Sequence, residues 1–189
     1  MKIFLIRHGE AKIVNEKAIL TKNGVIEAKS LAKELSKYSF SKVYTSDLTR
    51  SEDTAKEYIT LTKTEKLIKT EKLREIYRVL VGGPIKPNTS KDRKKNDKKR
   101  ADQMFEELLK EEKNTLVFCH GNIIRYFLNK VMKSKENIWD TITINNGSIS
   151  ILEFEKGQVN IKAINLIGHL PKEIKEKIYN SNKKEIYFQ

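Results

Sequence analysis

The sequence predicts an α/β domain with a largely parallel sheet and helices on both faces. Short apolar runs of strand length alternate along the chain with longer segments of helical periodicity, a pattern typical of parallel sheets. Near the end, two segments of alternating apolar and polar residues flank a glycine, which predicts an antiparallel hairpin at a sheet edge. The length of 189 residues suits one domain, so we expect a single domain over residues 1–189.

The first half of the chain contains three predicted strands and two predicted helices. The strands are Lys2–Ile6, Lys42–Thr45 and Leu67–Ile68. Lys2–Ile6 is apolar throughout after its first residue, as in a strand that is buried on both faces. From Lys22 onward apolar residues fall on one helical stripe, and Thr21 is placed to cap that helix. The second helix follows Lys42–Thr45 and has Ala55 and Ile59 on its inner side.

The second half begins with a predicted loop and a charged run. Leu80–Ser90 holds two glycines and two of the three prolines, so we expect a loop there. Lys91–Arg100 lacks apolar residues, and its default interpretation is a solvated or disordered insertion. The elements predicted after it are a helix at Ala101–Glu112, a strand at Thr115–Cys119, a helix at Ile123–Met132, and hairpin strands at Ser148–Phe154 and Val159–Ile167.

Composition narrows the class of protein. The 38 basic and 25 acidic residues give a net charge of +13, which is compatible with nucleic-acid, anionic-membrane or phosphorylated partners. The abundance of lysine, isoleucine and asparagine also fits an AT-rich genome, so we do not favour nucleic-acid binding. No apolar stretch approaches the ~18–20 residues of a membrane span, and the chain opens directly on a strand pattern without a signal peptide. The one cysteine, Cys119, fits a reducing compartment, and we expect an intracellular, cytoplasmic protein.

Two histidines share one local setting. His8 follows the first predicted strand and precedes a glycine, and His120 follows the strand Thr115–Cys119 and precedes Gly121. Ligands of parallel α/β sheets bind at the carboxyl ends of the strands, so both side chains are expected at one crevice. Glycine lacks a Cβ, which allows the backbone to approach a ligand closely. We therefore expect a ligand site at this end of the sheet.

Two arginines predict what that ligand is. Arg7 adjoins His8, and Arg50 lies in a connection that follows the strand Lys42–Thr45. A guanidinium offers a planar fork of donors that suits phosphate oxygens, so the four side chains predict a phosphoryl site. No carboxylate pair or His-x-x-His spacing accompanies the histidines, so we expect no metal.

Six segments in order carry a family resemblance: IRHGE at 6–10, LTKNGVIEA at 20–28, YTSDLTRSEDTA at 44–55, LRE at 73–75, VFCHGNIIRYFL at 117–128 and NNGSI at 145–149. The chain resembles the histidine phosphatase superfamily, whose fold is phosphoglycerate mutase-like. That resemblance implies a three-layer α/β/α sandwich with a mostly parallel central sheet, and a phosphatase that needs no metal or other cofactor.

The resemblance also implies a role for each site residue. His8 is implied as the nucleophile that forms a phosphohistidine, with His120, Arg7, Arg50 and the Gly121 backbone around the phosphate oxygens. Glu75 is implied as the acid and base, and Glu10 is the alternative because it lies two residues after His8. Cys119 is expected to be buried packing.

Within the superfamily, the chain is similar to the mitochondrial phosphoglycerate-mutase-like serine/threonine protein phosphatases, through LRE, GGPIKP at 82–87, NNGSI and IGHLP at 167–171. It departs from them in lacking a membrane-spanning or targeting segment. It also has Val14 where an asparagine is usual, with Asn15 one residue late. The implied substrate is a phosphorylated protein or a small phosphomonoester, in the cytoplasm or in mitochondria.

Several alternatives stay open at this point. They are a phosphoglycerate mutase, a phosphohistidine phosphatase, and a module that binds phosphorylated partners without catalysis. Homo-oligomerisation is also open. If Lys91–Arg100 flanks the mouth of the site, its charges would attract anionic substrates; if it is a passive insertion, they would not.

Overall fold

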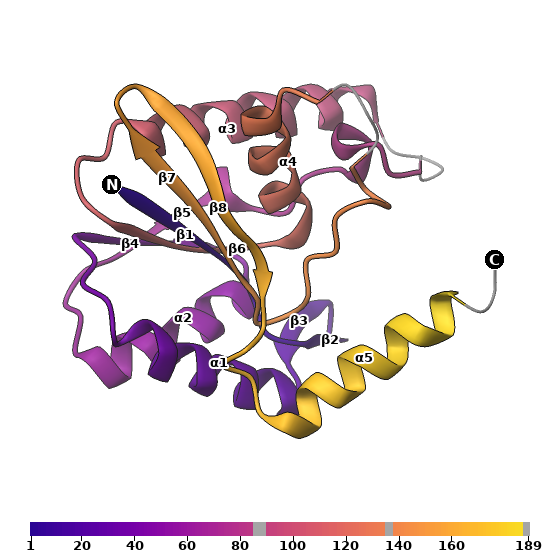
Figure 1. Cartoon of the computed structure of the whole chain (residues 1–189). Coiled ribbons are helices and arrows are strands. Elements are labelled where there is room, and N and C mark those ends of the chain that lie inside the picture. The colour runs from indigo at the N-terminus through magenta and orange to yellow at the C-terminus, as the bar shows by residue number, and fades with distance from the viewer. Residues whose placement is uncertain (85–89, 135–137, 187–189) are drawn as a thin grey trace.

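The computed structural model describes residues 1–84, 90–134 and 138–186, with the backbone alone for residues 91 and 182–186 (Figure 1). Six strands form one sheet in the order β5-β4-β6-β1-β7-β8. The parallel strands are β1 (Lys2–Arg7), β4 (Lys42–Ser46), β5 (Leu67–Thr70) and β6 (Thr115–Cys119). The antiparallel edge is made by β7 (Ile149–Glu155) and β8 (Gln158–Leu166). The mostly parallel sheet and the closing hairpin are therefore confirmed.

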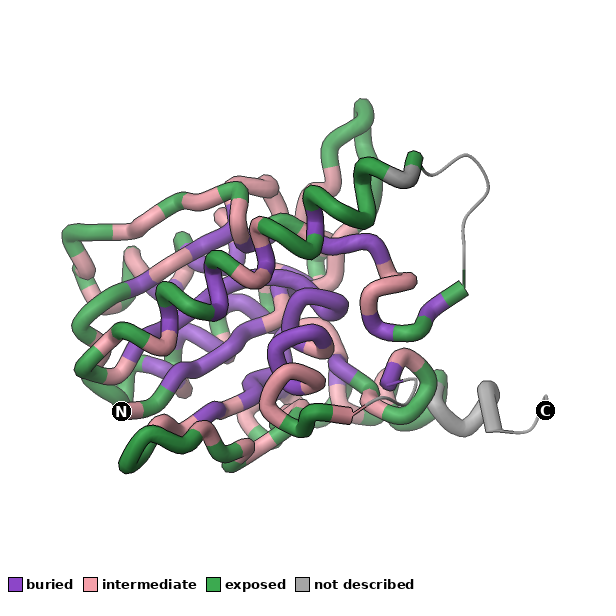
Figure 2. Tube along the Cα trace, turned by 90° about the horizontal axis from the view of Figure 1, so that it is seen from above, coloured by how far each residue is buried: buried purple, intermediate pink, exposed green. Residues whose placement is uncertain are grey.

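Helices cover both faces of the sheet. They are α1 (Lys22–Leu35) and α2 (Thr49–Thr62) on one face, and α3 (Lys91–Leu109) and α4 (Gly121–Met132) on the other (Figure 1). Strand β1 alternates between the two layers: Ile3 and Leu5 pack with α3 and α4, whereas Phe4 and Ile6 pack with α1 and α2. Figure 2 shows burial along the central strands and on the helix faces turned toward them. The three-layer α/β/α architecture is confirmed.

Other elements lay outside the sequence expectations. They are the hairpin β2 (Ala11–Val14) and β3 (Lys17–Leu20), the 3-10 helices η1 (Glu71–Leu73) and η2 (Arg78–Val81), and the helix α5 (Lys172–Ile186). The hairpin turns at Asn15 and Glu16, whose φ angles are 46° and 65°. Its pattern was missed because β2 is mostly exposed and its apolar residues do not alternate toward a core.

The charged run is an ordered helix, which corrects the expectation of a disordered insertion. Helix α3 begins at Lys91 and not at Ala101, and the Ser90 hydroxyl caps it by accepting from the Arg93 amide at 3.2 Å. Most side chains of the run are exposed, but Asp97 is buried. Of the predicted loop Leu80–Ser90, residues 80 and 81 belong to η2, and 85–89 lie outside the described residues.

The sheet brings the carboxyl ends of its central strands together. Strand β1 lies between β6 and β7, and Arg7 is in register with Cys119. The residues that follow these strands, His8 and His120, are therefore neighbours at one edge, as the strand-end argument predicts. In the residues that the model describes, no helix is long and apolar enough to cross a membrane.

Candidate active site

The two strand-end histidines face each other. The ring centroids of His8 and His120 are 5.1 Å apart, with an angle of 64° between the ring planes. Both side chains are buried, with 7% of His8 and none of His120 exposed to solvent. The predicted juxtaposition is present, and it places two imidazoles at the carboxyl end of the sheet.

Hydrogen bonds fix the tautomer of His8. Its Nδ1 lies 2.8 Å from the Gly9 carbonyl oxygen, which can only accept, so Nδ1 carries the proton. Its Nε2 therefore holds a lone pair, and that atom accepts from the Arg50 Nε at 2.9 Å. Burial, followed by the charges of Arg7 and Arg50, lowers the pKa of His8 to about 3, although the bond to Gly9 raises it. His8 is thus neutral near pH 7, with its lone pair on Nε2, where the Arg50 guanidinium donates to it.

Two further guanidinium groups converge beside Gly121. Arg7 donates from Nη1 to the Ile144 carbonyl, while its buried Nε has no hydrogen-bond partner among the described residues. A Cβ placed on Gly121 would lie 3.3 Å from the Arg125 Nη1 and 3.5 Å from the Arg7 Nε. The glycine therefore leaves the space beside two guanidiniums open, as close approach of an anion requires.

His120 is oriented by Ser46 at the end of β4. Its Nε2 lies 2.9 Å from the Ser46 hydroxyl, and its buried Nδ1 has no partner among the described residues. Buried polar atoms are usually satisfied. Two such atoms in one site, Nδ1 of His120 and Nε of Arg7, are typical of a place where an oxygen-rich ligand binds.

Glu75 lies in the chain between η1 and η2, and its carboxyl contacts the first turn of α4. One of its carboxylate oxygens accepts from the Asn122 amide at 3.0 Å and from the Ile76 amide at 3.2 Å. Burial raises the pKa of Glu75, although the charges of Arg7 and Arg50 and the Asn122 amide lower it in part. A carboxyl whose pKa is raised gives up its proton less readily than an ordinary glutamate, which favours a role in proton transfer.

Glu10, the alternative acid, is engaged elsewhere. Its carboxylate accepts from the Thr21 hydroxyl at 2.7 Å and pairs with the Lys177 ammonium of α5 at 2.8 Å. These contacts lower the pKa of Glu10 and favour its ionised form. The geometry thus favours Glu75 for proton transfer.

The loop that carries His8 and Gly9 is held by close backbone packing. A Cβ on Gly9 would lie 2.5 Å from the Gly24 carbonyl oxygen, so the loop and α1 touch backbone to backbone. The Gly9 amide donates to the Thr54 hydroxyl at 3.0 Å, and that hydroxyl donates to the Arg50 carbonyl at 2.7 Å. Helix α2 therefore fixes the His8 loop and the Arg50 segment together.

The loop before β7 supports His8 from the other side. The Asn146 side chain and the Gly147 amide both donate to the His8 carbonyl at 3.2 Å. His169 in turn lies 2.9 Å from the Gly147 carbonyl. This chain of contacts links the NNGSI and IGHLP segments to His8.

Four contributors escaped the sequence prediction: Ser46, Asn122, Arg125 and Asn146. Asn122 and Arg125 are spaced i,i+3 directly after His120 and Gly121, so they share the first turns of a helix that faces the site. That spacing is the signal that could have found them. Of the other residues, Cys119 is fully buried, and burial raises the pKa of its thiol. Both observations fit the expected role of Cys119 as a packed core residue. Asn15 lies at the exposed β2–β3 turn.

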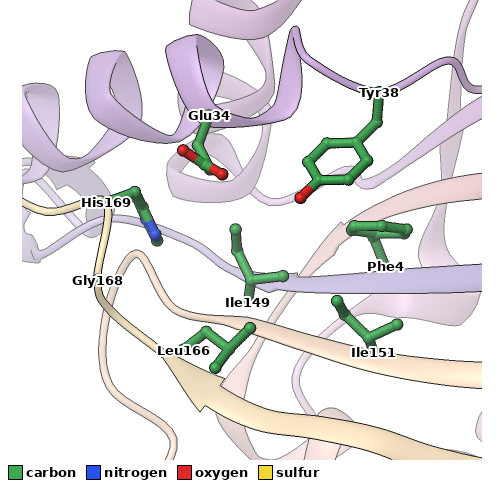
Figure 3. A pocket seen from close by; sticks show the side chains of 8 residues that line it. All are labelled: Phe4, Glu34, Tyr38, Ile149, Ile151, Leu166, Gly168 and His169. Carbon is green, nitrogen blue, oxygen red and sulfur yellow. The ribbon is translucent and has the colours of Figure 1, made fainter.

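A separate pocket lies on the α1 side of the antiparallel edge (Figure 3). Figure 3 shows Glu34 of α1 and Tyr38, which follows that helix, above Phe4, Ile149, Ile151 and Leu166, with His169 at one side. None of the predicted site residues lines it. Within residues 1–84, 90–134 and 138–186, no three His, Cys, Asp or Glu side chains form a group that could hold a metal ion.

A family model covers most of the chain. The model of the histidine phosphatase superfamily (branch 1) matches residues 3–167, so the chain belongs to that superfamily. The resemblance deduced from the sequence motifs is confirmed.

Particular relatives agree with this assignment. The chain is 29% identical over 187 residues to the mitochondrial serine/threonine-protein phosphatase Pgam5 of Caenorhabditis briggsae, and 30% identical over 189 residues to that of Drosophila mojavensis. Each match covers 89% of this chain and 64% of the relative, so the chain matches slightly less than two thirds of the length of those proteins.

Solved structures show the same fold. A phosphoserine phosphatase of Entamoeba histolytica, solved with 3-phosphoglyceric acid, matches with a TM-score of 0.73 at 23% identity, over 90% of this chain and 99% of that one. A protein of Escherichia coli described as an alpha-ribazole-5'-P phosphatase matches with a TM-score of 0.73 at 17% identity, over 88% and 96% of the two chains.

Proposed function

We propose that the chain is a metal-independent phosphomonoester hydrolase that works through a phosphohistidine on His8, and that its substrates are serine/threonine phosphoproteins. The observation that carries the proposal is the His8 imidazole, which is neutral, has Nε2 as its lone-pair nitrogen, and touches the Arg50 guanidinium at 2.9 Å. A neutral nucleophile between cations is suited to attack a phosphate, whose own negative charge repels anionic nucleophiles.

In the first step, the Nε2 lone pair of His8 forms a bond to phosphorus and the ester P–O bond breaks. The leaving oxygen takes the electron pair of that bond and a proton from Glu75. Arg7, Arg50 and His120 would stabilise the three equatorial oxygens, where charge is concentrated during transfer. The Gly121 backbone, which lies beside Arg7 and Arg125, would allow these oxygens to approach closely.

In the second step, water attacks the phosphorus of the phosphohistidine, and the N–P bond breaks with its electrons returning to Nε2. Glu75 takes a proton from the water and is ready for the next cycle. Neither step needs a metal ion or a redox partner, because charged side chains of the protein supply the electrostatic stabilisation.

Substrate class and compartment rest on the relatives. Their names describe serine/threonine-protein phosphatases of mitochondria, which supports phosphoprotein substrates and a mitochondrial location in preference to the cytoplasm. Location is tested by imaging a fluorescent fusion of the full chain in its own cell type: overlap with a mitochondrial marker is expected, and a diffuse cytoplasmic signal would contradict it.

Trapping of the intermediate tests the mechanism. Wild-type protein mixed with a ³²P-labelled phosphothreonine peptide and quenched in alkali should retain label that acid then releases, as phosphohistidine does and phosphoserine does not. His8→Ala should retain none and should lose turnover while keeping its fold, judged by circular dichroism. Label on His8→Ala would overturn the assignment of the nucleophile.

A substrate panel tests the activity. We expect hydrolysis of a phosphothreonine peptide and of an aryl phosphate, and no isomerisation of 3-phosphoglycerate. Mutase turnover that exceeds hydrolysis would overturn the hydrolase proposal, and so would hydrolysis restricted to a phosphohistidine peptide.

A further inference from the structure

A pocket of about 220 Å³ opens beside the Glu75 carboxyl, on the face of the sheet that α3 and α4 cover. Its lining includes Glu75, Tyr77, Arg78, Arg93, Asn122 and Trp139. The Asn122 amide that borders it donates to Glu75, so the pocket adjoins the group proposed to protonate the leaving oxygen. Whatever is attached to that oxygen would extend toward this pocket.

Guanidinium groups cover the aromatic rings of the pocket. The Arg93 Cζ lies 5.7 Å from the centroid of Tyr77, and the Arg78 Cζ lies 5.8 Å from that of Trp139. Stacking uses the flat face of a guanidinium and leaves its in-plane N–H donors able to bind an anion. The Nε of Arg78 is buried and has no hydrogen-bond partner among the described residues. The pocket therefore presents cationic donors to a substrate.

Charge balance around Arg93 leaves a positive excess. Arg93 forms an ion pair with Asp97, in which the Arg93 Nε lies 3.5 Å from Oδ2. Asp97 is already bound by the Arg100 Nη2 at 2.7 Å and by the Tyr77 amide at 2.8 Å. One carboxylate thus faces two guanidiniums, and Arg93 has charge to spare for a ligand.

We infer that this pocket binds an acidic side chain that flanks the phosphorylated residue of a protein substrate, with Arg78 and Arg93 holding its carboxylate. The inference rests on the proposed phosphatase function, since binding of the substrate's phosphate beside His8 would determine where the flanking residues of the peptide lie. A peptide fits better than a small acid because the pocket lies beside Glu75, where the residue that carries the phosphate and its chain neighbours would extend from the leaving oxygen.

Binding to His8→Ala protein tests the inference without requiring turnover. Two fluorescent phosphothreonine peptides differ only in having Asp or Asn on both sides of the phosphothreonine, and anisotropy gives Kd for each. We expect the Asp peptide to bind about tenfold more tightly, the scale of a hydrogen bond to a charged group. In the His8→Ala background, Arg93→Gln should remove most of that ratio, and Arg78→Gln with Arg93→Gln should remove it. Lys94→Gln, a matched loss of one charge outside the pocket, should preserve it.

Three results would overturn the inference. The first is equal affinity for the Asp and Asn peptides, and the second is an affinity ratio that persists in the Arg78→Gln, Arg93→Gln double variant. The third is a ratio that falls as much in Lys94→Gln as in Arg93→Gln, which would show that the overall positive charge of α3 attracts the peptide and not the pocket. Tighter binding of 3-phosphoglycerate than of the Asp peptide would also overturn it, in favour of a small phosphorylated acid. Failure of phosphoenzyme trapping with the affinity ratio intact would refute the proposed chemistry and leave the pocket assignment standing.

Discussion

Arg100 joins the basic helix to the segment that carries Glu75, and Arg100→Met tests that connection. Its guanidinium donates to Asp97 Oδ1 from Nη2 at 2.7 Å and from Nε at 3.2 Å. It also donates to the carbonyls of Arg74 at 2.6 Å and Glu75 at 2.9 Å. Methionine keeps the length and apolar volume of the side chain but removes every one of these donors, so the buried Asp97 carboxylate and two carbonyls lose their main partner.

The size of the loss follows from burial. Removing one partner of a buried ion pair costs about 3–5 kcal/mol. The Arg100 side chain is 18% exposed, and Arg93 and the Tyr77 amide stay beside Asp97, so we reduce the estimate to about 2–3 kcal/mol. At about 2–4 °C per kcal/mol for a chain of this size, Tm should fall by about 4–12 °C.

Thermal and urea unfolding measure this loss, and Lys98→Met is the matched control on the same helix. Lys98 pairs with Asp102 at 2.6 Å but is 59% exposed, so its loss should change stability by no more than ~0.5 kcal/mol. In the Asp97→Asn background, Arg100→Met should cost much less, because the carboxylate that needs compensation is gone. If Arg100→Met is no more damaging than Lys98→Met, α3 does not hold the Glu75 segment and the reasoning fails.

Three further predictions concern the site. Glu75→Gln should lower kcat for alkyl phosphates about 100- to 10,000-fold, the usual contribution of general acid catalysis, and should affect activated aryl phosphates less; equal losses in steady-state assays would remove Glu75 from the acid role. Gly24→Ala places a Cβ 2.0 Å from a backbone carbonyl oxygen and should destabilise the fold by about 1–3 kcal/mol, whereas Gly168→Ala, with open space around it, should be near neutral in the same melts. Because burial lowers the pKa of His8 to about 3, its imidazole NMR signals should stay at neutral-ring positions from pH 8 down to pH 5, and a midpoint near 6.5 would contradict the lowered pKa.

The fold was predictable because its central strands are encoded locally. Strands β1 and β6 are nearly continuous apolar runs that are buried on both faces, unlike the other strands in the described part of the chain. Once the strands are known, the rule that ligands bind at carboxyl ends places His8 and His120 in one site without any knowledge of the helices. The roles assigned to these residues remain predictions, but their meeting did not require the structure.

The helical start of α3 was not predictable from apolar periodicity, because its first turns are held by charge. Asp97 and Arg100 lie three residues apart on one face and pair with each other while they bind the backbone of the Glu75 segment. A pattern search that scores apolar residues cannot recognise such a face. In the same way, the β2–β3 hairpin has a two-residue turn at Asn15 and Glu16 without the glycine that usually signals one.

The arrangement of charge connects the fold to the proposed chemistry. Desolvation lowers the pKa of Arg7, Arg50 and Arg125, because each guanidinium is partly removed from water at the carboxyl end of the sheet. Their mutual repulsion is opposed by Glu75, whose charge acts on all three. A bound phosphate would also be attracted by these three arginines and would repel the Glu75 carboxylate. Its binding would therefore favour the protonated form of Glu75. Substrate binding would thereby prepare the acid that the first chemical step requires, and the same rigid packing around Gly9 and Gly24 would keep the nucleophile in place while it does so.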